Sequence, residues 1–251
     1  MTWTDTHCHI HDPEFFPNGG QDPYTRALEV GVKRLICVGT DEDSSRLAVD
    51  FAAEREGCFA TIGIHPHDAK VGRGAVEEIA KLLGTTNKIV GIGEIGLDYY
   101  YDNSPRQAQR DILQAQIELA IEHNLPINFH VRSAFDDFWP IFDQYPGLRG
   151  VLHSYTDDLA NLEKALSRNL LIGVNGIVTF ASDREPVTKA IPLDSMLLET
   201  DAPFLTPKPY RGKINEPAFV ISIAQFVADL RSISLEELSH ETEQNAHQLF
   251  F

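Results

Sequence analysis

Eight short runs of apolar and β-branched residues recur along the chain, and longer amphipathic segments separate most of them. Short runs that are apolar throughout are typical of strands buried on both faces. Such strands alternating with helices favour a parallel sheet, and eight of them predict an α/β fold, a single (β/α)8 TIM barrel. A doubly wound open sheet is the alternative, because periodicity alone does not close a barrel. The runs occupy residues 4–9, 35–39, 60–65, 89–94, 127–130, 150–153, 171–175 and 196–201.

Helical periodicity is clearest between the fourth and fifth runs, at 105–123. Ser104 stands where it can cap this helix, and Pro105 suits its first position. A barrel of this type takes about 250 residues, so a chain of 251 residues predicts one domain over 1–251. Other helices are expected at 43–56, 74–83, 133–144, 157–168, 183–190, 216–230 and 234–249.

The cysteine content favours a reducing compartment. Cys8, Cys37 and Cys58 are odd in number and form no Cys-x-x-Cys pair, a pattern typical of free thiols rather than of a disulfide framework. The sequence shows no signal-peptide pattern and no apolar run of about 18 residues. We therefore expect a cytoplasmic protein that does not enter a membrane, and we expect a monomer.

The acidic balance of the chain limits its modes of binding. A formal net charge of −16 at pH 7 argues against broad electrostatic capture of nucleic acid. It leaves room for a nucleic-acid substrate, because bound divalent cations attract phosphates locally.

Polar side chains that can bind metals stand at the ends of six of the eight runs. In a (β/α)8 barrel the carboxyl ends of all strands meet on one face, where active sites form. A single buried histidine is usually a hydrogen-bonded core residue, but six convergent strand ends predict a metal centre. These residues are His7 with His9, then His65, Glu94, His130, His153 and Asp201.

His7 and His9 begin this pattern. Side chains two apart on an extended segment point to the same face, and neutral imidazole is a common ligand of zinc and related ions. Cys8 lies between them and points to the other face, so we exclude it as a ligand.

The carboxylates extend the predicted centre. A carboxylate such as Glu94 deep in a barrel needs a partner, either a metal or an arginine. If the partner is a metal, the two oxygens of Glu94 can bridge two ions. His130 and His153 are natural ligands of that second ion. Asp201 is suited to bind the first ion and to accept the proton of an attacking water, whose pKa a metal lowers towards about 7 in favourable sites.

Further polar residues are candidates for substrate contacts. His65 is suited to hydrogen-bond substrate oxygens, and Arg132 to contact a phosphate. Arg211 belongs to a proline-rich, basic loop at 203–217. The tyrosines at 99–101 are candidates to stack on nucleobases. The alternative is that they pack beneath a loop.

The ordered motifs of the chain resemble those of the TatD family of metal-dependent deoxyribonucleases, within the amidohydrolase-like superfamily. The resemblance extends over nearly the whole sequence, and the ordered set is far more specific than any one motif. The motifs are Asp5-Thr-His-Cys-His9, Gly63-Ile-His-Pro-His67, Gly93-Glu-Ile-Gly-Leu-Asp98, His130-Val-Arg132, His153-Ser154, Glu199-Thr-Asp-Ala-Pro203, Asn215-Glu-Pro217 and Asn245-Ala-His-Gln-Leu-Phe250.

The resemblance also implies roles for individual residues. It implies that Asp201 accepts a proton, that His65 contacts a substrate phosphate and that Asp98 is structural. Ile214 replaces the arginine usual before the Asn-Glu-Pro signature, and Arg211 is a candidate to compensate. The implied ligands are His7, His9 and Asp201 at one metal, His130 and His153 at the other, and Glu94 shared between them.

By resemblance, the chain is a 3′–5′ exodeoxyribonuclease that prefers single-stranded DNA and uses two divalent ions, magnesium, manganese or zinc. The alternative is a hydrolase of an ester or amide, such as a D-aminoacyl-tRNA deacylase, because the same activated water can attack a carbonyl and the fold does not decide the substrate. Glu94 stands where lactonase-like relatives carry a carbamylated lysine, which disfavours that branch. A non-catalytic metal-binding protein is a third possibility, and the complete ligand set argues against it.

Overall fold

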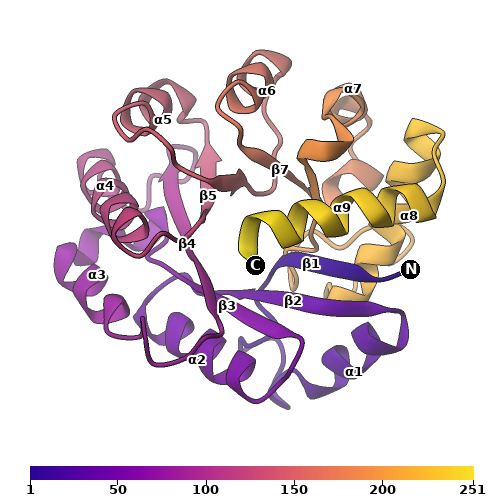
Figure 1. Ribbon diagram of the computed structural model, residues 1–251, viewed down its shortest axis with the longest axis horizontal. Coiled ribbons are helices and arrows are strands. Elements are labelled where there is room, and N and C mark those ends of the chain that lie inside the picture. The colour runs from indigo at the N-terminus through magenta and orange to yellow at the C-terminus, as the bar shows by residue number, and fades with distance from the viewer. The chain divides into compact units, whose positions relative to one another are not determined.

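The computed structural model describes residues 1–251 and contains eight strands, one for each predicted run (Figure 1). The strands follow one another in the sheet in chain order, from β1 to β8. A doubly wound sheet reverses its strand order at a switch point, whereas sequential order is that of a (β/α)8 barrel, so the predicted fold class is confirmed. The strands are β1 Trp3–Cys8, β2 Val32–Val38, β3 Cys58–Ile62, β4 Ile89–Asp98, β5 Ile127–Arg132, β6 Gly150–Leu152, β7 Leu171–Val174 and β8 Met196–Leu198.

Nine α-helices accompany the strands, and eight of them match predicted segments. The exception is α1, in which only Pro23 and Ala27 are buried. Its apolar stripe is therefore too thin to produce a clear helical period. The helices are α1 Gln21–Glu29, α2 Glu42–Ala53, α3 Arg73–Ala80, α4 Arg106–Glu122, α5 Phe135–Phe142, α6 Leu159–Leu166, α7 Glu185–Ala190, α8 Val220–Arg231 and α9 Leu235–Phe250.

The predicted cap of α4 is wrong. The helix begins at Arg106, and no side chain caps it. The Ser104 hydroxyl instead donates to the carbonyl of His67 (2.6 Å) and accepts from the backbone N–H of Lys70 (3.1 Å). Ser104 therefore ties the start of α4 to the 3-10 helix η1, Pro66–Val71.

Contacts divide the chain into two compact units. The terminal unit comprises Met1–Cys37, His153–Leu249 and Phe251, and the central unit comprises Val38–Leu152 and Phe250. Both units contain parallel strand pairs, β1–β2 and β7–β8 in the terminal unit and β3–β4, β4–β5 and β5–β6 in the central unit.

In the terminal unit, buried polar contacts hold the ends of the chain to the strands. Asn245 of α9 donates through Nδ2 to the carbonyls of Leu193 (2.7 Å) and Met196 (2.8 Å), at the start of β8. Beyond the other end of β8, Ala202 forms a parallel bridge with Cys8 of β1. These contacts fix the segment around position 201 against the end of β1.

In the central unit, α2 packs against β3 and α4 against β4 (Figure 1). The fourth predicted run, 89–94, is too short, because β4 continues past Glu94 to Asp98 and pairs there with β5. Gly96 permits this pairing, since a Cβ atom at this position would lie 1.8 Å from the carbonyl oxygen of His130. Glu94 therefore lies inside a strand rather than at its end.

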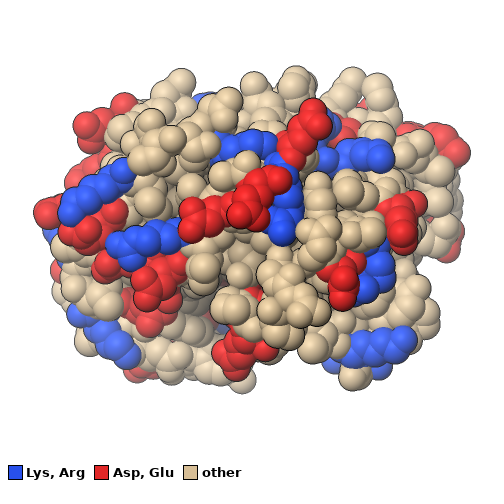
Figure 2. Space-filling view, turned by 90° about the horizontal axis from the view of Figure 1, so that it is seen from below, with Lys and Arg blue, Asp and Glu red and all other residues tan.

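Helix length and the charges on one face of the molecule bear on membranes and on nucleic acid. No single helix is long and apolar enough to cross a membrane, and α8 with α9 meets that test only as a pair bent by 114°. Lysines and arginines are interspersed with acidic residues on the face shown in Figure 2.

Candidate metal centres

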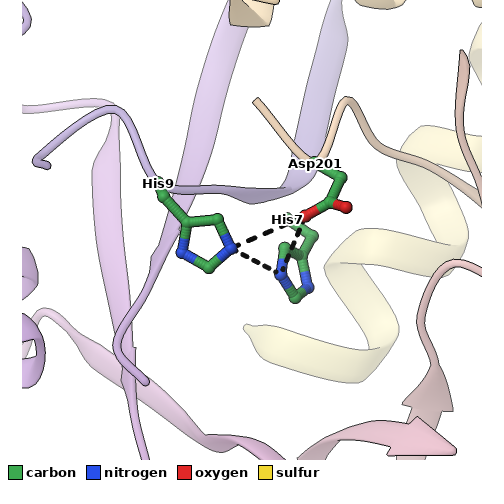
Figure 3. Close-up of side chains that lie close together, drawn as sticks. All are labelled: His7, His9 and Asp201. Carbon is green, nitrogen blue, oxygen red and sulfur yellow. Dashed lines mark hydrogen bonds and ion pairs between the residues drawn. The ribbon is translucent and has the colours of Figure 1, made fainter. Parts of the chain in front are cut away.

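Backbone pairing brings three predicted ligands together in the terminal unit. His7 lies in β1, and His9 follows directly after it. The N–H of Asp201 donates to the carbonyl of His7 (2.9 Å), and the N–H of His9 donates to the carbonyl of Ala202 (2.7 Å). Reciprocal bonds of this kind hold the two segments in a fixed register, so the three side chains point towards one another (Figure 3).

The spacing of their donor atoms matches that of ligands around one cation. His7 Nε2 lies 3.3 Å from His9 Nε2, and Asp201 Oδ1 lies 3.7 Å and 3.5 Å from these two atoms. Ligands about 2.0–2.1 Å from a tetrahedral ion are separated by about 3.3–3.4 Å. His7, His9 and Asp201, which we name the terminal cluster, therefore fit a divalent ion.

The surroundings of Asp201 favour its ionised form. Burial alone raises the pKa of this carboxyl, but a hydrogen bond from His9 and the nearby His7 and His153 outweigh burial and hold the pKa below its ordinary value. Cys8 is buried, and its Sγ lies 3.6 Å from the carbonyl oxygen of Ile36. This position agrees with its exclusion as a ligand.

His153 lies beside His7 in the terminal unit, directly after β6. Their rings stack with centroids 3.9 Å apart and an angle of 14° between the ring planes. Glu199 is fully buried and completes this second group of possible donors, with Oε1 3.7 Å from His153 Nδ1. A histidine binds an ion in the plane of its ring, so the stacked rings of His7 and His153 are poorly placed to share one ion. We therefore interpret Glu199 as a residue beside the metal ligands rather than as the third ligand of an ion shared by these histidines.

The central unit builds a different cluster from His65, Glu94 and His130, named here the central cluster. His130 Nδ1 and Glu94 Oε1 are hydrogen-bonded at 2.7 Å, and His65 Nε2 lies 3.4 Å from the same oxygen. The sequence predicts His65 as a substrate contact, whereas the structure places it among potential ligands. Burial lowers the pKa of His65 to about 4, against the opposing effect of Glu94, so its ring is neutral at pH 7.

Asp98 contacts the central cluster through His130. Its Oδ2 accepts from His67 Nε2 (3.0 Å) and pairs with His130 Nε2 (3.2 Å). Burial raises the pKa of Asp98, but bonds with His130, Tyr101 and His67 outweigh it and hold the pKa well below its ordinary value. Sequence reasoning assigned His67 no role, and its side chain is 28% exposed. The Gly-Ile-His-Pro-His motif was the available signal for this contact.

The predicted substrate contacts lie in separate surroundings. Arg132, in the central unit, stacks over the rings of Tyr100 and Tyr101. Arg211, in the terminal unit, donates to the carbonyl of Thr206 (2.9 Å) and lies over the ring of Phe180. A substrate role for either arginine stays a prediction.

The Asn-Glu-Pro signature anchors the loop in which it lies. Asn215 is fully buried and donates to the carbonyls of Thr200 (2.8 Å) and Phe204 (2.5 Å). Glu216 binds the guanidinium of Arg26, from α1, with both of its oxygens. An arginine distant in sequence therefore neutralises Glu216, and sequence spacing gave no sign of this pairing.

Comparison with known proteins agrees with this fold. A family model described as TatD related DNase matches residues 4–251. The "Uncharacterized metal-dependent hydrolase YabD" of Bacillus subtilis (strain 168) is 37% identical over 98% of both chains. The "3'-5' ssDNA/RNA exonuclease TatD" of Erwinia billingiae is also 37% identical, over 90% of each chain.

A solved structure supports the same relationship. The crystal structure of YJJV, a TatD homologue from Escherichia coli K12, superposes with a TM-score of 0.92 at 28% identity and covers 99% of this chain and 97% of that one. A family match over nearly the whole chain and shared (β/α)8 architecture lead to one conclusion. The chain belongs to the TatD family of metal-dependent hydrolases.

Proposed function

We propose that the protein is a metal-dependent phosphodiesterase, a 3′–5′ exodeoxyribonuclease that prefers single-stranded DNA. The convergence of His7, His9 and Asp201 at 3.3–3.7 Å carries this proposal, because such spacing suits a divalent ion at the carboxyl ends of strands. The relative from Erwinia billingiae, named as an ssDNA/RNA exonuclease, supports the choice of substrate class.

The ligand roles follow the family resemblance. We assign His7, His9 and Asp201 to one ion, and His130 and His153 to another, with Glu94 shared between them. Magnesium, manganese and zinc all suit a mixture of imidazole and carboxylate donors. A bound divalent ion lowers the pKa of water and stabilises the charge that develops on a phosphate.

The protein side chains then orient the substrate and move the proton. Asp201 is ionised and its side chain is 14% exposed, so water reaches a carboxylate able to accept its proton. His65 is neutral at pH 7 and can donate one hydrogen bond to a phosphate oxygen. Arg132 and Arg211 are the cations proposed to contact the phosphates of the substrate.

A matrix of substrates and metals tests this function. Metal-stripped protein is incubated with end-labelled single-stranded DNA, duplex DNA, RNA and a D-aminoacyl-tRNA, each with magnesium, manganese or zinc. We expect stepwise shortening of single-stranded DNA from its 3′ end, lost in the His9→Ala variant and kept in a His123→Ala control at the exposed end of α4. Ester hydrolysis without cleavage of any nucleic acid would overturn the nuclease proposal in favour of the deacylase.

We also propose that residues 1–251 form one domain, that the protein is monomeric and that it resides in the cytoplasm. One domain predicts a single unfolding transition that coincides by circular dichroism and by fluorescence of Trp3 and Trp139, which lie in different units. Light scattering behind size exclusion and cell fractionation test the other two statements. Two separated transitions would contradict the single domain.

A further inference from the structure

Two exposed tyrosines lie side by side just after β4. Tyr100 is 61% exposed and Tyr101 is 54% exposed. Their rings meet edge to face, with centroids 4.9 Å apart. Large aromatic rings usually stabilise a protein by burial. An exposed adjacent pair therefore gives up that stabilisation and marks a surface suited to binding.

The third tyrosine of the run shows what a packing role looks like here. The hydroxyl of Tyr99 donates to Asp137 Oδ2 (2.7 Å) and lies 3.3 Å from Arg110 Nη1. The guanidinium of Arg106 covers its ring, 4.3 Å from the centroid. Tyr99 is thus engaged within the protein, which separates it from the two tyrosines that follow.

Arg132 adds a positive charge to the exposed pair. Its guanidinium carbon lies 4.0 Å from the ring centroid of Tyr100 and 4.8 Å from that of Tyr101. The chain has 37 acidic and 21 basic residues, yet Arg132 forms no salt bridge, whereas Arg26, Arg34 and other arginines do. A guanidinium stacked on aromatic rings keeps its N–H donors in its own plane, free for a phosphate.

The backbone holds this surface beside the central cluster. The N–H groups of Tyr100 and Tyr101 both donate to Asp98 Oδ1, at 2.9 Å and 3.2 Å. The other oxygen of Asp98 contacts His67 and His130. The rings of Tyr101 and His67 meet edge to face, with centroids 5.4 Å apart. One buried carboxylate therefore fixes the position of the tyrosines and of a predicted metal ligand.

We propose that Tyr100, Tyr101 and Arg132, the tyrosine–arginine platform, bind one nucleotide of a single-stranded substrate. A nucleobase stacks on a ring face that Arg132 does not cover, and Arg132 binds the adjoining phosphate. Bases in a duplex already stack on their neighbours, so the platform selects unpaired strands. This inference rests on the proposed nuclease function and names the part of the chain that recognises the unpaired nucleotide.

Binding of a short, non-hydrolysable phosphorothioate oligothymidylate tests the stacking part of the proposal. We expect the Tyr100→Leu/Tyr101→Leu variant to bind it roughly 5- to 100-fold more weakly than the wild type, the range for loss of base stacking. The matched Tyr100→Phe/Tyr101→Phe variant keeps both rings and should stay within about twofold. An abasic oligomer of equal length should bind the wild type and the leucine variant equally.

Equal weakening for the abasic oligomer, or no weakening for oligothymidylate, would overturn stacking on these rings. Metal content and the thermal unfolding midpoint are measured alongside, so that a collapse around Asp98 is recognised as such. Failure of the platform and of the nuclease function are distinguishable. If the wild type degrades single-stranded DNA while the leucine variant keeps its KM, only the platform is wrong.

The salt dependence of binding tests Arg132. Each phosphate contact on a single strand contributes about 0.7 to the slope of log K against log salt. Arg132→Gln should reduce the slope by about that amount, for both the base-bearing and the abasic oligomer. Arg46→Gln, which removes an exposed arginine of α2 paired with Asp43, is the matched control. An unchanged slope in Arg132→Gln would contradict the phosphate contact.

Discussion

The terminal and central clusters use the same kinds of side chain, yet they hold their donor atoms differently. In the terminal cluster, His7, His9 and Asp201 stand 3.3–3.7 Å apart, a spacing close to that of ligands around an ion. In the central cluster, His130 is hydrogen-bonded to Glu94 at 2.7 Å and flanked by Asp98 at 3.2 Å. The contacts within the terminal cluster are therefore longer than the bond between His130 and Glu94.

This difference has an energetic consequence. An ion that binds Glu94 and His130 must replace their charge-assisted hydrogen bond, which contributes about 1.5–3 kcal/mol. The donor atoms of the terminal cluster lie 3.3–3.7 Å apart, so an ion there replaces longer contacts. We therefore expect the terminal cluster to bind a divalent ion roughly 10- to 100-fold more tightly than the central cluster.

The largest expected effect comes from removing terminal donors. His9→Ala and Asp201→Asn should each lower kcat on single-stranded DNA by roughly a hundredfold or more, because a positioned group that stabilises developing charge is lost. Steady-state kinetics at saturating manganese measures this effect, with His123→Ala as the control. Near-normal turnover in both variants would refute a catalytic role for the terminal cluster.

A smaller effect should follow from Asp98→Asn. Removing a carboxylate that orients a ligand histidine typically weakens metal binding about 10- to 100-fold. In this protein we expect only the weaker metal-binding event, at the central cluster, to be affected. The nitrogen chemical shifts of His130 provide a second readout, since they report which ring nitrogen carries the proton. A uniform loss at both events would point to misfolding instead.

Glu199→Gln should have a still smaller effect in the terminal unit. Glu199 Oε1 accepts from the N–H of Ser154 (2.6 Å), while its buried Oε2 has no hydrogen-bond partner. The amide keeps the shape and loses the charge near His153, so we expect turnover to fall several-fold with metal content unchanged. Glu243→Gln, which breaks the salt bridge to Arg34, should leave turnover intact. Loss of metal from the Glu199 variant would instead identify a direct ligand.

The smallest effect is expected at Asp137, a carboxylate of the central unit outside its cluster. Bonds with Tyr99 and Arg110 hold its pKa below the ordinary value despite some burial. Such a group stabilises the fold above its unfolded pKa and loses that contribution as pH falls through its folded pKa. Asp137→Asn should cost under about 1 kcal/mol at pH 7, with the difference from wild type vanishing in acid. Urea unfolding across pH measures it, and a constant difference would contradict the assigned ionisation.

Much of the fold and of both clusters was predictable because strand periodicity and strand-end polarity report on the same geometry. The eight apolar runs marked the strands, and side-chain alternation separated His7 and His9 from Cys8. Helix α1 was not predicted because only two of its residues are buried. The length of β4 depended on Gly96 passing close to β5, which no periodicity reveals.

The finer chemistry of the clusters depends on tertiary contacts that sequence spacing does not encode. His67 meets Asp98 across 31 positions, and Arg26 meets Glu216 across 190. The position of Glu94 and His130 at the ends of apolar runs predicted that they were candidate ligands, but not that they would be hydrogen-bonded to one another. That bond separates the two clusters energetically.

Calorimetric titration of metal-stripped protein with manganese tests the central claim most directly. We expect two binding events that differ roughly 10- to 100-fold in affinity. The tighter event should disappear in His9→Ala, and the weaker one in His130→Gln. Loss of the tighter event in His130→Gln, with its retention in His9→Ala, would contradict the account.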